Sequence, residues 1–436
     1  MHKSSRPTRL ATASWILYDL ANTAYSMNVV SLYFSTWIII DFGRSDFWVS
    51  LVNALSMLFV AFTMPVLGDW SDIKQKKLSA LMGFTLICIT GTAMLGVLGR
   101  VLPAGTLLLT LVLAIYIITN YSYQGGLVFY NALMPAVSTP KNMGRVSGYG
   151  AAIGYMGTIL GLIVAGIFVE GSFFGLSLPG VTAGGTVAAF IPTAVLFLLF
   201  AIPIFIFVNE SLIPAPAQRT WKLKASYAKV INNIKDTQQY PGLLRFLISR
   251  LLYQDSVSTI IIYMGVFTQV AMNFTLDEAR LFMITLTPFA IVGSALCGIL
   301  TDHYGPKKVL TVVILLWVLS LGVIIVNTDR TVFWVMGGIV GILLGSIETS
   351  SRPMLITLAP LEKMGEFFGI YALSGRLAAI IGPMIWSLVT FSLGAFGDVF
   401  KFKAAIGALG VIMLLGLLVL RPVPDFHKKI KKADIS

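Results

Sequence analysis

The chain has 436 residues, of which 57% are hydrophobic and 11% are charged, and its formal net charge is +12. A soluble domain carries about 45–50% apolar and about 25% charged residues, so a water-soluble enzyme of this length is excluded. A disordered chain is excluded as well, because disorder needs low hydrophobicity and high charge. The two cysteines, Cys88 and Cys297, lie in apolar stretches, so neither a disulfide framework nor a metal site is predicted. The composition indicates an integral membrane protein.

Apolar runs long enough for a membrane helix, about 20 residues, occur twelve times along the chain. The predicted spans are residues 13–40, 47–68, 78–99, 105–133, 146–168, 187–208, 243–270, 281–300, 308–327, 331–358, 367–393 and 397–420. One long polar break, residues 209–242, separates six spans from six. We therefore predict an all-α membrane protein with two pseudo-symmetric six-helix bundles, over residues 1–208 and 243–436.

The basic residues are divided unevenly between alternate loops. If both termini are cytoplasmic, 22 of the 31 Lys and Arg residues lie in inner segments and 6 lie in outer loops. This bias agrees with the positive-inside rule, so we predict a multi-pass protein of the cell (inner) membrane with both termini cytoplasmic. The positive charge thus indicates topology rather than nucleic-acid binding. The break at 209–242 is predicted to contain an amphipathic helix on the inner membrane surface, with a solvated linker as the alternative.

A short motif follows the second span and recurs 230 residues later, after the eighth. Each copy has a glycine, an aspartate four residues on, and then paired lysines, in a predicted loop. The glycine allows a tight helix exit, the aspartate can meet a neighbouring helix N-terminus or an arginine, and the lysines hold the loop at the anionic leaflet. The alternative is a merely basic turn. The motif residues predicted to act in gating are Gly68, Asp72, Lys76, Gly298, Asp302 and Lys307.

With twelve predicted spans, this motif resembles the cytoplasmic Gly-x-x-x-Asp-(Arg/Lys)-x-Gly-(Arg/Lys)-(Arg/Lys) motif of the major facilitator superfamily, although Ile73 and Gln75 depart from it. Five further strings span nearly the whole chain, at residues 18–25, 129–135, 147–150, 253–255 and 366–376. Together they resemble the branch containing the autophagy-related vacuolar amino-acid effluxers of fungi and their bacterial relatives. The resemblance implies secondary transport of an amino acid or a similar metabolite, through a cavity lined by helices one, four, seven and ten.

Among the ionisable residues inside the predicted spans we single out six, namely Asp19, Arg250, Asp255, Glu348, Arg352 and Arg376. Charge at membrane depth is costly, so each of them is a functional hypothesis. We predict that Asp19 or Asp255 couples transport to the proton gradient. The alternatives are an inter-helix lock for Asp19 and permanent pairing with an arginine for Asp255. Glu348 and Arg352 share a helix face, and with Arg376 they form either a site for an anionic or zwitterionic substrate or a charge network that closes the inner gate.

Polar and aromatic residues beside these charges complete the predicted substrate site. Its residues are Asn22, Tyr25, Asn120, Tyr121, Gln124, Tyr253, Glu348 and Arg352, and Arg376 is assigned to gating. Without a Walker loop, ATP-driven transport has no support.

We predict a secondary active transporter that moves a small solute by alternating access and is proton-coupled. The resemblance implies export. We expect no enzymatic activity and no cofactor, a monomer, and contact with membrane lipids. The first alternative is a lipid or amphiphile flippase or multidrug exporter on the same fold, and the second is a non-transporting membrane receptor or sensor.

Overall fold

The computed structural model describes residues 7–173, 176–177, 180–214, 220–223, 226–228, 232, 240–327 and 329–426. The side chains of residues 177, 276, 277, 280 and 376–380 are also outside the description. Most of the amphipathic helix predicted within 209–242 therefore lies outside the described residues. The side chain of Arg376 lies outside them as well. The chain divides into two compact units, which are described separately.

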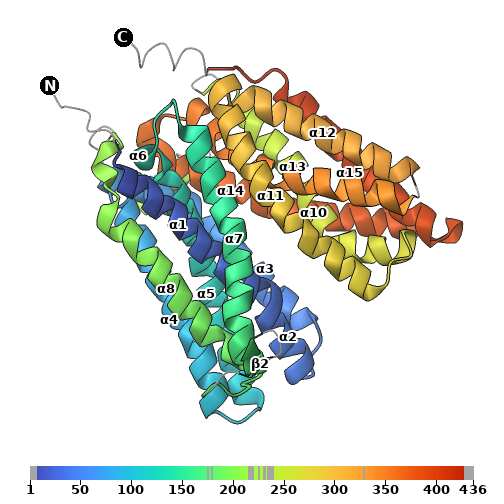
Figure 1. Ribbon diagram of the computed structural model, residues 1–436. Coiled ribbons are helices and arrows are strands. Elements are labelled where there is room, and N and C mark those ends of the chain that lie inside the picture. The colour runs from blue at the N-terminus through green and yellow to red at the C-terminus, as the bar shows by residue number, and fades with distance from the viewer. Residues whose placement is uncertain are drawn as a thin grey trace. The chain divides into compact units, whose positions relative to one another are not determined.

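The first unit comprises Met1–Ser138, Ile153–Trp221 and Glu362–Gly369. Its first span is one helical run that changes type: α1 (Arg9–Tyr25), the π-helical η1 (Ser26–Tyr33), α2 (Phe34–Thr36) and the π-helical η2 (Trp37–Asp41). The elements that follow are α3 (Phe47–Lys74), α4 (Lys77–Val101), α5 (Thr106–Ala132), α6 (Met134–Val137), α7 (Met143–Glu170), β1 (Ser172–Phe173), β2 (Leu176–Ser177), η3 (Thr186–Ala189), α8 (Phe190–Phe207) and η4 (Glu210–Leu212). In this unit α1 packs along α8 (Figure 1), and α4 packs against both α5 and α8.

The second unit comprises Thr139–Ala152, Lys222–Leu361 and Ile370–Ser436, so α7 and the helix α14 each contribute to both units. Its elements are α10 (Leu243–Ala271), α11 (Leu276–Tyr304), α12 (Pro306–Val326), α13 (Arg330–Leu358), η5 (Leu361–Lys363), α14 (Met364–Ser392), η6 (Gly394–Phe396) and α15 (Asp398–Leu420). Within this unit α10 packs against α15, α11 packs against α13, and α12 packs against α13 and α15.

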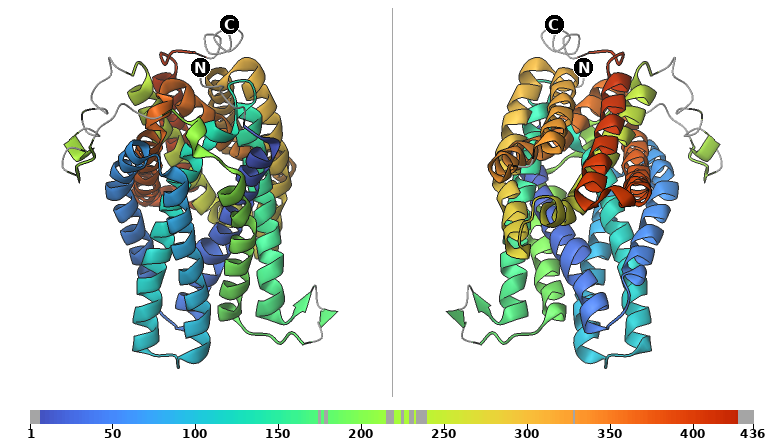
Figure 2. Two further views of the ribbon diagram at one scale, coloured as in Figure 1. Left: turned by 90° about the vertical axis from the view of Figure 1, so that its left-hand side faces the viewer. Right: turned by 90° about the vertical axis from the view of Figure 1, so that its right-hand side faces the viewer.

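The helices agree with the predicted all-α membrane architecture. Among the residues that the structure describes, nine helices are long and apolar enough to cross a membrane. The other three predicted spans coincide with the run from α1 to η2, with α10 and with α14. Two of these spans contain buried ionisable residues, Asp19 in α1 and Arg250 and Asp255 in α10. These charged side chains lower the mean hydropathy of the two helices. The short antiparallel pair β1–β2 was not predicted. It lies in the connection between α7 and α8, beside the ends of these helices (Figure 2).

Side-chain caps fix where several helices begin. The Thr8 hydroxyl accepts from a backbone N–H in the first turn of α1, at 3.1 Å. Thr275 and Glu278 form a reciprocal capping box at the start of α11. The backbone N–H of Thr275 lowers the pKa of the Glu278 carboxyl below its ordinary value. At α13 the Asp329 carboxylate accepts from the Val332 N–H, which lowers the pKa of Asp329.

The motif glycines and aspartates lie on helices, which corrects the predicted loops. Asp72 is in the last turn of α3, and Asp302 is in the last turn of α11. The chain reverses only after them, at the positive φ angles of Gln75 (51°) and Gly305 (93°). Gly68 is therefore not a helix exit. Its missing side chain lets the backbone at Gly365 approach, because an added Cβ would collide with that carbonyl.

Candidate functional site

A buried arginine in the second unit joins three helices. The Arg250 Nη2 atom on α10 lies 3.2 Å from Glu348 Oε1 on α13. The Tyr371 hydroxyl on α14 donates to Glu348 Oε2 at 2.9 Å. The Arg250 guanidinium also stacks on the Tyr371 ring, with its central carbon 3.5 Å from the ring centroid. Arg250 is thus the centre of the cluster, whereas the prediction placed Glu348 with Arg352 and Arg376.

The guanidinium is only partly satisfied. Its Nε and Nη1 atoms are buried and have no hydrogen-bond partner among the described residues. The Arg250 side chain is 6% exposed, while that of Glu348 is 34% exposed, so the cluster is open on the Glu348 side. Two unpaired donors on a fixed cation form an arrangement that can bind a carboxylate or another anion.

A buried carboxylate, Asp255, lies on α10, one turn and a half beyond Arg250. Asp255 Oδ1 accepts the Gly382 backbone N–H of α14 at 2.6 Å. Asp255 Oδ2 and the Thr259 hydroxyl are both buried and without a hydrogen-bond partner in the described part of the chain. A side chain at Gly382 would collide with both residues, so only glycine fits there. Asp255 therefore combines burial with an oxygen free to take a proton.

Amide side chains form the polar part of the first unit. Asn53 Oδ1 of α3 accepts from Asn120 Nδ2 at 3.0 Å and from the Tyr116 hydroxyl at 2.9 Å, both on α5. Asn120 Oδ1 remains without a partner among the described residues, and so does Asn22 Nδ2 on α1. Asn28 Oδ1 and Asn131 Oδ1 are likewise buried and without a partner, so the described part of the unit holds three unpaired amide acceptors and one unpaired amide donor.

The other residues predicted for the first unit have packing contacts. Asp19 is buried against α7, where the chain has Gly154. Tyr25 packs on Tyr123, with ring centroids 4.8 Å apart. The Tyr121 hydroxyl lies 2.9 Å from the Thr63 hydroxyl, which directs it toward α3. Gln124 is buried on α5, and in the second unit the Tyr253 hydroxyl lies 2.8 Å from that of Ser351.

Asp72 caps the start of α14 within the first unit. Its carboxylate accepts from the backbone N–H groups of Gly365 at 2.9 Å and Glu366 at 2.8 Å. The Lys77 ammonium lies 2.8 Å from Asp72 Oδ1, and both side chains are almost fully buried. The lysine predicted at the membrane surface is thus inside the protein, where it offsets the buried carboxylate, while Lys76 is exposed.

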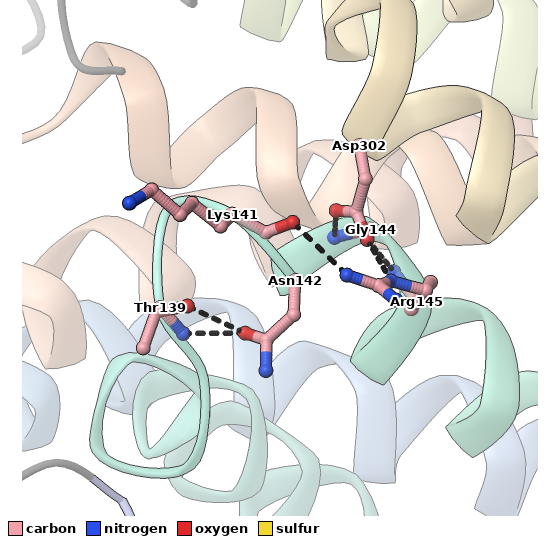
Figure 3. Close-up of polar contacts among 6 residues, drawn as sticks. All are labelled: Thr139, Lys141, Asn142, Gly144, Arg145 and Asp302. Atoms are coloured by element: carbon pink, nitrogen blue, oxygen red, sulfur yellow. Dashed lines mark hydrogen bonds and ion pairs between the residues drawn. The ribbon is translucent and has the colours of Figure 1, made fainter. Parts of the chain in front are cut away.

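Asp302 makes the equivalent contact in the second unit. Figure 3 shows its carboxylate against the start of α7, where it accepts from the Gly144 N–H at 2.6 Å and from Arg145 Nε at 2.7 Å. Gly298 lies against the Gly144 carbonyl, where a side chain would not fit. Lys307 donates to the Arg421 carbonyl at 2.9 Å. A helix N-terminus and an arginine are the two partners that the motif predicted for its aspartates.

Comparison with known proteins decides the family. The family model described as vacuole effluxer Atg22-like matches residues 46–426. The chain belongs to this Atg22-like family. The MFS-type transporter YxiO of Bacillus subtilis (strain 168) is 26% identical over 427 residues, which cover 94% of each chain. The multidrug resistance protein MdtG of Rahnella sp. (strain Y9602) is 24% identical, over 90% of this chain and 89% of that protein.

Solved structures show the same fold for this Atg22-like chain. The human organic anion transporter MFSD10 (TETRAN) matches with a TM-score of 0.71 and 14% identity, over 96% of this chain and 100% of that one. The proton:xylose symporter XylE matches with a TM-score of 0.67 and 14% identity, over 96% and 95% of the two chains. The predicted fold and the predicted superfamily are confirmed, and the chain is a multi-pass membrane transporter of the major facilitator type.

Sequence reasoning left four contributors out of the predicted site: Arg250, Tyr371, Thr259 and Asn53. Three of them carried a usable signal. Arg250 is one of the six ionisable residues singled out inside the predicted spans. Thr259 is four residues after Asp255 and so shares its helix face. Asn53 is an amide inside a predicted span, where amides need partners. The role of Tyr371 had no such signal, because its contact with Arg250 depends on how α14 packs on α10.

Proposed function

We propose that this transporter is a secondary active carrier of a small solute with a carboxylate group, of the amino-acid type, and that it couples this movement to protons. The single observation that carries the proposal is the Arg250 guanidinium, buried with two unpaired N–H donors. A buried cation of this kind retains unmet hydrogen-bonding capacity, and a carboxylate would satisfy it. The description of the family as vacuole effluxer Atg22-like and the similarity to the multidrug resistance protein MdtG support export.

The unpaired amide groups of the first unit support the same substrate class. Asn120 Oδ1 is a buried acceptor and suits an ammonium group, whereas Asn22 Nδ2 is a buried donor. We propose that Glu348 and Arg250 are solute contacts of the second unit and, separately, that Asn22 and Asn120 are solute contacts of the first unit. Tyr25, Tyr121, Gln124 and Tyr253 remain proposed lining residues, in the packing described above. Arg352, which is buried on α13, remains a proposed lining residue as well.

For gating, we propose that the two capping aspartates hold the helix starts of α7 and α14 in the closed state. These helices contribute to both units, so their first turns are suited to a switch in an alternating-access cycle. Gly68 and Gly298 permit the close backbone approach, and Asp72 and Asp302 supply the hydrogen bonds. We also propose that the transporter is a monomer and that both of its termini are cytoplasmic.

Transport of a matched solute panel tests the substrate class. Purified protein in proteoliposomes is given an amino acid, its decarboxylated amine, its methyl ester and a neutral sugar. We expect uptake of the amino acid alone, because the amine and the ester lack the carboxylate that Arg250 would bind. Transport of cationic amphiphilic dyes with no amino-acid transport would instead indicate a multidrug exporter and contradict the proposal.

Asp255→Asn tests the coupling. The substitution keeps the shape and the contact with Gly382 but removes the titratable carboxyl. We expect a pH gradient to drive no net accumulation in this variant, while exchange of labelled for unlabelled solute continues. Asp398→Asn, which changes an exposed carboxylate in the first turn of α15, is the matched control and should accumulate solute normally. Full accumulation in both Asp19→Asn and Asp255→Asn would contradict proton coupling at these carboxylates.

A further inference from the structure

An apolar groove lies within the second unit. It is formed by α11, α12 and α13 and has a volume of about 530 Å³. This lies within the range of about 300–1,000 Å³ that is typical of small-ligand sites. Its walls are aliphatic, with Leu296 and Leu300 from α11 facing Val312 and Leu316 from α12.

The groove opens to the outside of the helix bundle. Leu296 is 53% exposed, Leu300 is 46% exposed and Val312 is 52% exposed. In a chain that crosses a membrane, exposed aliphatic side chains on spanning helices face the lipid acyl chains. The groove is therefore accessible from the bilayer.

The polar groups on the floor of the groove are already bonded. The Ser346 hydroxyl donates to the Ile342 carbonyl at 2.8 Å. The Cys297 thiol donates to the Ser346 carbonyl at 3.4 Å. A polar solute would gain no hydrogen bond on this floor and would lose its bonds to water, so the groove favours an apolar occupant.

One end of the groove carries positive charge. Lys308 lines it from the first turn of α12, beside Tyr304 at the end of α11. Lys308 is exposed, and no carboxylate pairs with it in the part of the chain that the structure describes. The helix start at Gly305 has no side-chain cap, so its N–H groups add to the positive potential.

The distance along α12 from the lysine to the far end of the apolar wall is close to the hydrocarbon thickness of one leaflet. Leu316 is eight residues after Lys308, or about 12 Å along the helix. The hydrocarbon core of one leaflet is about 15 Å thick, half of the roughly 30 Å for the bilayer. A lipid with its phosphate at Lys308 would therefore place one acyl chain along the whole groove.

We propose that this groove is a specific binding site for an anionic phospholipid, with the phosphate paired to Lys308 and one acyl chain lying between α11 and α12. The site does not depend on which solute the protein transports. In the predicted topology it faces the cytoplasmic leaflet, whose anionic lipids supply the ligand.

Native mass spectrometry of delipidated full-length protein tests the site. Phosphatidylglycerol and phosphatidylcholine with identical acyl chains are titrated separately. We expect one molecule of phosphatidylglycerol to bind more tightly than phosphatidylcholine. Lys308→Gln should weaken phosphatidylglycerol binding roughly fivefold, as expected for one lysine near an anionic headgroup. Lys74→Gln removes an exposed lysine that does not line the groove and should leave this binding event unchanged.

Two filling variants test the acyl-chain part. Leu300→Trp and Val312→Phe enlarge exposed side chains on opposite walls, and each should abolish the tight binding event for both lipids. Leu415→Trp, which enlarges an exposed leucine on α15, is the matched control. Equal affinity for the two lipids, which share the phosphate but differ in net charge, would overturn the preference for an anionic headgroup. Wild-type binding in both filling variants, each shown by thermal unfolding to be folded, would overturn the groove as the site.

Discussion

Asp72→Asn is expected to lower the free energy of unfolding by about 3–5 kcal/mol, because it removes one partner of a buried ion pair. The Lys77 ammonium, 2.8 Å from Asp72, is 1% exposed and would be left without a counter-ion. The change also weakens the cap on α14, since an amide has one acceptor oxygen where the carboxylate uses two. Unfolding in mixed micelles with increasing SDS, followed by tryptophan fluorescence, measures the loss.

The corresponding change in the second unit provides the comparison. Asp302→Asn removes the partner of Arg145, whose side chain is 48% exposed and can turn to water. We therefore expect a loss of only about 1–2 kcal/mol, from a weakened helix cap and a partly exposed ion pair. The double variant Asp72→Asn with Lys77→Met should recover part of the Asp72→Asn loss, because no unpaired charge is then buried. Equal losses at Asp72 and Asp302 would contradict this account.

Arg250→Gln is expected to reduce solute uptake by about 100-fold or more, which corresponds to about 3 kcal/mol. The variant lacks the cation, its two unpaired donors and the stacking on Tyr371. Arg250→Lys keeps the charge but has neither the planar face nor the donor fork, so we expect an intermediate loss of about tenfold. Initial uptake rates in proteoliposomes at several solute concentrations measure both effects.

Two further variants separate a role in binding from a general role in folding. Tyr371→Phe removes the hydroxyl that donates to Glu348 but keeps the ring under Arg250, so we expect a loss of only a few-fold, about 1 kcal/mol for one hydrogen bond. Arg330→Gln changes an arginine of the same unit whose side chain is 47% exposed, and it should leave uptake unchanged. Wild-type uptake by a correctly folded Arg250→Gln would contradict the proposed carboxylate site.

The sequence by itself determined the fold class, because hydropathy and the repeated motif act over long stretches. Twenty-residue apolar runs must be helical in lipid, where every backbone polar group needs a partner within the chain. The predicted span at 105–133 corresponds to α5, which ends within one residue of it at each end. The motif also predicted the kind of partner for Asp72 and Asp302, a helix N-terminus or an arginine, since a short carboxylate has few ways to be satisfied.

Only the tertiary structure decided which charges meet. In the sequence, Glu348 and Arg352 are four residues apart and look like a pair, yet the Glu348 carboxylate contacts Arg250 and Tyr371. Residues 98 and 23 positions away in the chain reach it because α10, α13 and α14 pack together. Likewise, Lys77 resembles a surface lysine in sequence but is buried beside Asp72. Helical periodicity gives the face on which a side chain lies, whereas its partner depends on which helix covers that face.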